Sequence, residues 1–73
     1  MNAHSIATHR IEVELSAIPA SLIPSLTADR ARMAAILAEE LSAITTSERD
    51  SYLKEIGAAE LTRFVELLPR AAA

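Results

Sequence analysis

Residues 44–48 read I-T-T-S-E and separate two long segments in which apolar residues recur with the period of a helix. Thr45 followed three residues later by Glu48 is the pattern of a capping box, in which side chains and backbone satisfy each other's open groups at a helix start. So short a connection makes the two flanking helices antiparallel neighbours. The sequence therefore predicts an all-α protein built on an antiparallel helical hairpin over residues 25–68.

The segment before this junction collects its large apolar residues on one side of a helix. We expect the helix to begin near Ser25 or Thr27, because either side chain can cap it. At 100° per residue, one face holds Leu26, Met33, Ile36, Leu37, Leu41 and Ile44. Ala35 lies behind this face. We expect the large apolar face to pack against the second helix of the hairpin.

The segment after the junction runs from Thr46 to Leu68 and ends before Pro69. Gly57 lies inside its apolar arc and leaves two alternatives open, a glycine terminator that splits the segment or one continuous helix. Continuity is favoured because the apolar phase is kept across the glycine. In a continuous helix the hairpin register places Gly57 beside Met33, where the missing side chain would allow the helices to approach closely.

Residues 10–18, R-I-E-V-E-L-S-A-I, fit two kinds of structure. Ile11, Val13 and Leu15 alternate with polar residues as in a half-buried strand. Ile11, Leu15 and Ile18 also share one face of a helix. A short N-terminal helix is favoured, and the strand remains the alternative.

The chain has 73 residues, which is room for one domain. We expect a flexible N-terminus at residues 1–9, one helical domain at residues 10–68 and a C-terminal tail at residues 69–73. A chain this short buries only about 60% of its unfolded surface. Since it contains no cysteine, it has neither disulfides nor thiolate-bound metal to stabilise it. Association between copies is the remaining means of stabilising the fold. The predicted state is therefore a homodimer in which two hairpins form a four-helix bundle.

Composition and motifs argue against an enzyme. A single glycine excludes the glycine-rich loops that bind phosphate groups, and no serine lies in a nucleophile elbow. His4 and His9 are the only histidines, and their spacing does not place them on one helix face. We therefore expect no catalytic residue, no cofactor and no metal. The net charge of −3 gives no general electrostatic case for binding nucleic acid or an anionic membrane.

The expected location is the cytoplasm. The N-terminal residues lack the basic start and apolar core of a signal peptide. No apolar run approaches the roughly 20 residues that span a bilayer.

The apolar arc of the second long helix is wider than the first helix can cover. Leu61, Val65 and Leu68 lie on one flank of this arc, and Ile56 and Leu67 are candidates on the other. Exposed apolar strips of this extent usually mark interfaces. The sequence thus predicts a protein–protein interaction module, such as an adaptor, an assembly or secretion chaperone or a regulator. Leu61, Val65 and Leu68 would form the centre of its contact with a second copy or with a partner's amphipathic helix.

The alternative function is that of a DNA-binding repressor or antitoxin. The stretch R-I-E-V-E-L-S at residues 10–16 resembles the strand of the ribbon-helix-helix fold, which pairs across a dimer and precedes two helices. The resemblance implies that Arg10, Glu12, Glu14 and Ser16 face the DNA groove, with two acidic residues opposite phosphates and base edges. A strand at these residues favours DNA binding, whereas a helix favours the bundle.

Overall fold

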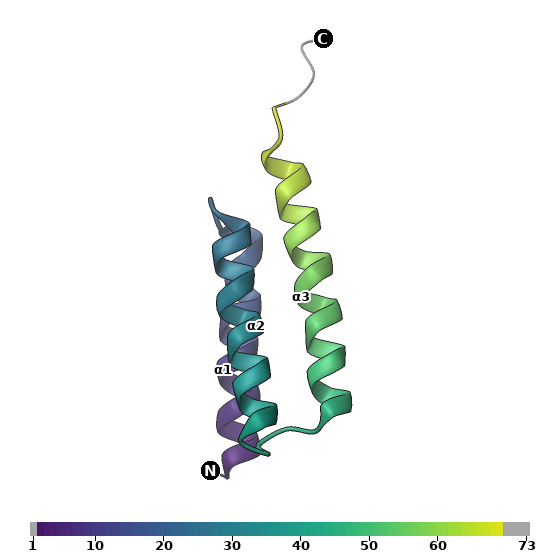
Figure 1. Cartoon of the computed structure of the whole chain (residues 1–73). Helices are drawn as coiled ribbons and strands as arrows, with labels where there is room; N and C mark the ends of the chain where they lie inside the picture. The colour runs from purple at the N-terminus through teal and green to yellow at the C-terminus, as the bar shows by residue number, and fades with distance from the viewer. Residues whose placement is uncertain (1, 70–73) are drawn as a thin grey trace.

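The computed structural model describes residues 2–69, and they form three α-helices joined by short connections. α1 is Ala3–Ala17, α2 is Pro24–Glu40 and α3 is Thr46–Leu67, with one turn of 3₁₀ helix at Ile18–Ala20 after α1. The helices run up, down and up beside one another, and α3 extends beyond the other two (Figure 1). The described residues contain no strand, so the all-α prediction is confirmed for them.

The start of α3 contains the predicted capping box. The Thr45 hydroxyl accepts a hydrogen bond from the Glu48 backbone N–H at 3.1 Å, and the Glu48 carboxylate accepts one from the Thr45 N–H at 2.9 Å. Each bond satisfies a donor that would otherwise be open at the helix start. α3 then continues through Gly57 without a break, which confirms the continuous-helix alternative. The predicted C-terminal tail lies outside the described residues apart from Pro69.

The predicted packing role of Gly57 is wrong. A Cβ atom added at this position would meet no atom of the described chain within 4 Å, apart from the glycine's chain neighbours and its own helix backbone. Met33, the expected neighbour, is exposed on the outer face of α2. Gly57 therefore brings no two helices of this chain closer together.

α2 begins at Pro24, one residue before the predicted range. Proline suits the first turn because its φ is already near the helical value and the N–H that it lacks would have no partner there. Ser25 and Thr27 consequently lie inside the first turn as helical residues and not as caps. The Thr27 hydroxyl instead lies 2.6 Å from the hydroxyl of Ser21 in the preceding connection.

α2 ends about one turn earlier than its apolar pattern implied, in a Schellman motif. Ser42 has a φ of 60°, in the left-handed region. The N–H groups of Ser42 and Ala43 donate to the carbonyls of Glu39 and Ala38 at 2.9 and 2.8 Å. These two bonds close the helix end and reverse the chain. Ile44, expected on the helix face, is therefore buried in the connection between α2 and α3.

The N-terminal segment differs most from the sequence prediction. Residues 3–9, expected to be flexible, form the first turns of α1. Asn2 caps this helix, since its side chain accepts a hydrogen bond from the Ser5 N–H at 2.8 Å. The helical alternative for residues 10–17 is confirmed and the strand alternative is wrong. The ribbon that DNA binding required is thus replaced by helix.

The core of the protein is small and rich in alanine. α2 packs against both α1 and α3, which touch each other less. It presents one stripe of buried alanines to them: Ala28, Ala31, Ala35 and Ala38. Among the described residues, the large side chains that are completely buried are Ile11 and Ile18 next to this stripe and Ile56 from α3.

The inward face of α2 is opposite to the predicted one. The large apolar residues expected to face α3 are between 36% and 79% exposed: Leu26, Met33, Ile36, Leu37 and Leu41. Ala35, expected at the back, is completely buried. The reason is that α2 has two neighbours and not one. Small alanine side chains allow α1 and α3 to approach the same side of α2 together, which a row of leucines would prevent.

Two ion pairs fix the position of α3 along the length of α2. Arg32 pairs with Glu60, and Arg49 donates to Glu39 at 3.1 Å. The hydrogen bond with Glu60 raises the pKa of Arg32. The first pair lies at the middle of α2 and the second near its C-terminal end, so together they align the two helices along their length.

Candidate interaction surfaces

Large apolar side chains are more frequent on the surface of this protein than in its core. Fourteen large hydrophobic residues of the described chain are at least 36% exposed, whereas three large side chains are completely buried. A single exposed leucine needs no explanation, but contiguous apolar surface marks interaction sites. Most of the fourteen gather in two places, between α1 and α2 and at the C-terminal end of α3.

The first place is a groove of about 690 Å³ between α1 and the C-terminal half of α2. Its described lining residues come from these two helices and the connection after α2, and none comes from α3. The large side chains along it are Ile6, Met33, Leu37 and Leu41, each about half exposed or more. Alanines of both helices form its floor. We call this surface the α1/α2 groove.

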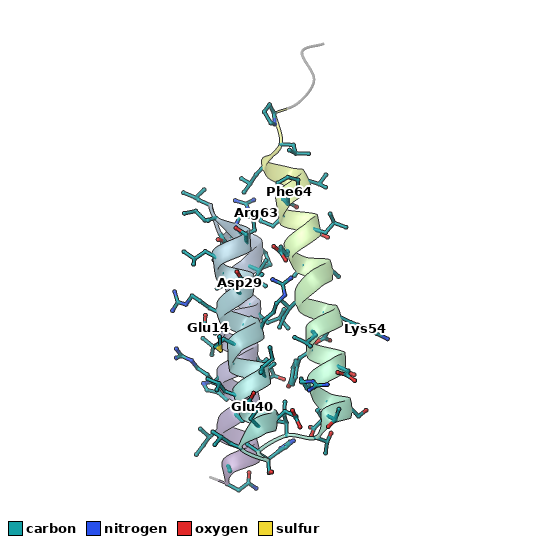
Figure 2. All side chains as sticks on the ribbon, in the orientation of Figure 1. Glu14, Asp29, Glu40, Lys54, Arg63 and Phe64 are labelled. Carbon is teal, nitrogen blue, oxygen red and sulfur yellow. The ribbon has the colours of Figure 1, made fainter. Side chains whose placement is uncertain are left out.

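The charged residues of the α1/α2 groove satisfy one another. Arg10 forms an ion pair with the Glu14 carboxylate at 3.1 Å, and Arg30 lies 3.6 Å from its other oxygen. Glu14 is buried between the two arginines, on the side of the molecule away from α3 (Figure 2). An unpaired buried carboxylate would be costly. Because this one has two cationic partners, covering that part of the groove leaves no carboxylate without a partner.

The second place is the end of α3 that extends beyond α1 and α2 (Figure 1). Leu61, Val65 and Leu68, the predicted centre of an interface, are 63%, 56% and 47% exposed. We call these three residues the α3 strip. Phe64 lies beside it and is also exposed (Figure 2). Phe64 was not among the interface residues predicted from the sequence.

The other flank of α3 is not a free surface. Leu67 is partly exposed, but Ile56 is completely buried in a cluster with Ile18, Ala28 and Ala31. The expectation that Ile56 is an interface candidate is therefore corrected, since it belongs to the core. Its flank was left open in a two-helix hairpin, and the N-terminal segment covers it through Ile18.

Arg63 attaches the end of α3 to the rest of the protein. Its Nε donates a hydrogen bond to the carbonyl of Ser21 at 2.8 Å, and its Nη1 donates to Glu66 at 3.3 Å. The connection between α1 and α2 is thereby held against α3. This connection carries two further exposed apolar residues, Leu22 and Ile23. The α3 strip is thus presented by a helix whose position is set by a hydrogen bond to the main chain.

Covering either surface would be strongly favourable. Complete burial of a Val, Leu, Ile, Met or Phe side chain is worth roughly 1.5–3 kcal/mol. The four large groove residues together expose more than two whole side chains, and so do Phe64 and the α3 strip. Each surface therefore offers roughly 3–7 kcal/mol. That gain is comparable with the whole stability of many small domains, roughly 5–15 kcal/mol.

Polar side chains of α1 and α3 line a second, smaller hollow of about 320 Å³: Glu12, Ser47, Glu48, Ser51, Tyr52 and Glu55. His4 Nε2 lies 2.7 Å from Glu48 Oε2, and this hydrogen bond is the main cause that lowers the pKa of Glu48. The Tyr52 hydroxyl donates to Glu12 at 3.3 Å. No group of three or more potential ligands within residues 2–69 is placed to hold a metal ion.

None of the three described helices is long and apolar enough to cross a membrane. Comparison with models of protein families found no matching family, and neither curated proteins nor solved structures match the chain. The function of the two apolar surfaces is therefore inferred from their own chemistry.

Proposed function

We propose that this protein is a non-enzymatic protein–protein interaction module that acts through its exposed apolar helical faces. The observation that carries the proposal is the unequal distribution of large apolar side chains. The buried hydrophobic residues are four alanines and four isoleucines, whereas most of the described leucine, methionine, valine and phenylalanine side chains are exposed. A partner that covers these side chains supplies burial that the chain cannot supply alone.

The α3 strip suits a helical partner. Leu61 and Val65 lie one turn apart on α3, and Leu68, spaced i+7 from Leu61, is the residue that caps the helix end. This is the spacing at which amphipathic helices present their anchors to each other. The seven helical residues from Leu61 to Leu67 are only about 10 Å long, which suits a small, transient interface. An adaptor, an assembly or secretion chaperone, or a regulator would use such a contact.

Self-association is the second part of the proposal. We infer that the protein is a homodimer in which helices of two copies form a four-helix bundle. The reason is the size of its core, since few large side chains are buried in one copy. Small domains with marginal cores commonly gain their stability from association.

Capture experiments with a charged variant of the α3 strip test the partner-binding role. The tagged wild type, Val65→Asp and the control Thr62→Asp, an exposed polar residue of the same helix, are each incubated with native lysate. Val65 is more than half exposed, so the folded chain tolerates the carboxylate, which circular dichroism verifies. Proteins captured by wild type and Thr62→Asp but lost with Val65→Asp are the expected result. Capture that does not depend on Val65 would contradict the proposal.

A further inference from the structure

We propose that a second copy of this chain occupies the α1/α2 groove, so that α1 and α2 of two copies form the four-helix bundle and α3 lies outside it. This inference rests on the proposed function and assigns one of its two surfaces to self-association. It also differs from a bundle of two α2–α3 hairpins, because α1 replaces α3 as the second helix of each copy.

The orientation of α2 is the first argument. The alanine side of α2 already packs against α1 and α3. Leu26, Met33 and Leu37 lie at i, i+7 and i+11 on the opposite side and are exposed. In helical bundles, large side chains of this spacing fill the space between two helical layers. A further helical layer over the outer face of α2 is therefore expected.

The second argument is that the charged residues of the groove are already paired within the chain. Arg10 and Arg30 both pair with Glu14 within the chain, and the net charge of +1 that remains lies on arginine side chains that are 66% and 63% exposed. The remaining lining residues are alanine, isoleucine, leucine and methionine. The matching surface is thus apolar and helical, which is the character of the same face on a second copy. A twofold axis brings these two faces together, and the buried Glu14 of each copy keeps its two arginine partners.

The size of the surface is the third argument. α1 has 15 residues and α2 has 17, so their common face is about 25 Å long and about 20 Å wide. This outline covers about 500 Å² before the relief of the side chains is counted, which is of the same order as the roughly 800 Å² that each partner buries in a standard interface. A symmetric pair also buries Ile6, Met33, Leu37 and Leu41 twice, which offsets the entropy cost of association. The α3 strip, on a single helix and about half as long, offers a smaller contact area.

Charge substitution in the groove tests this assignment with the full-length chain. Sedimentation equilibrium is measured over a range of concentrations for wild type and Leu37→Glu. The matched control is Leu22→Glu, because Leu22 is more exposed, at 81%, and lies outside the groove. We expect wild type and Leu22→Glu to be dimers. In Leu37→Glu the dissociation constant should rise at least about 30-fold, the loss expected at the centre of an interface.

A second variant keeps the test decisive if Leu37→Glu does not fold without its dimer. Leu37→Ala retains helix propensity and leaves no charge, so we expect wild-type helicity by circular dichroism and a weaker dimer. A wild type that remains monomeric at high micromolar concentration overturns the inference. It is also overturned if Leu37→Ala dimerises as tightly as wild type, or if Val65→Asp dissociates the dimer and Leu37→Glu does not. In that last case the proposed interaction function is not contradicted. That function is contradicted by a separate result, which is capture of partner proteins that does not depend on Val65.

Discussion

Replacing Gly57 with alanine is expected to stabilise the protein by about 1 kcal/mol, the difference in helix propensity between the two residues. Gly57 lies in the interior of α3 with a helical backbone, which alanine adopts without strain. Its added Cβ would meet no atom within 4 Å in the described chain, beyond its chain neighbours and its own helix backbone. Part of the gain comes from the unfolded chain, because glycine has more conformational freedom to lose. For a domain of this size, the melting temperature should rise by roughly 4–8 °C.

Thermal and urea unfolding followed by circular dichroism measure this effect. Ala58→Gly is the matched control, since Ala58 is the next residue of the same helix and is exposed. It should lose about the 1 kcal/mol that Gly57→Ala gains. Gly57→Pro should lose about 3 kcal/mol or more, because proline removes a backbone donor and clashes with the preceding turn.

A destabilised Gly57→Ala variant would refute this reasoning, provided that Ala58→Gly behaves as expected. Such a result would mean that another chain lies against Gly57 in the native assembly. Gly57 and Leu61 are one turn apart on α3, so that contact would place the self-association surface on α3 and not in the α1/α2 groove. Repeating the melts at several protein concentrations separates this explanation from a local effect, because only a contact between copies depends on concentration.

Two further predictions concern titrating side chains. The hydrogen bond with His4, and next the one with the Thr45 N–H, lower the pKa of Glu48 below its ordinary value of 4.5. Its charge therefore contributes stability that is complete above pH 4.5 and is lost as the pH falls through the lower folded-state pKa. The stability difference between wild type and Glu48→Gln should shrink in urea melts below that pH, and a constant difference would argue against this. Burial, and next the charge of Glu12, raise the pKa of Tyr52 above its ordinary value of 10.0. Because the folded state then favours the neutral hydroxyl, stability should be lost as the pH rises above 10.0. Tyr52 is the only tyrosine, so the absorbance of tyrosinate reports its titration alone. The titration midpoint should lie above pH 10.0 and should fall in Glu12→Gln. An unchanged midpoint would count against the Glu12 contribution.

The sequence by itself determined the features that depend on one helix at a time. The capping box of Thr45 and Glu48 needs only a spacing of three residues, and it placed the start of α3 correctly. Continuity through Gly57 followed from the unbroken apolar phase of the same helix. The exposure of Leu61 and Val65 could be anticipated because α3 is longer than its partner and carries apolar residues on more than one side.

Only the tertiary structure decided which sides of the helices are buried. Helical periodicity identifies an apolar face but carries no information about how many neighbours the helix has. Once α1 extends to Ala3 and packs beside α3, the alanine side of α2 is the only one that both can approach closely, and Leu37 is left outside. The same added helix covers Ile56 through Ile18. Burial is a property of all the neighbouring elements together, so it could not be read from the pattern of any one of them.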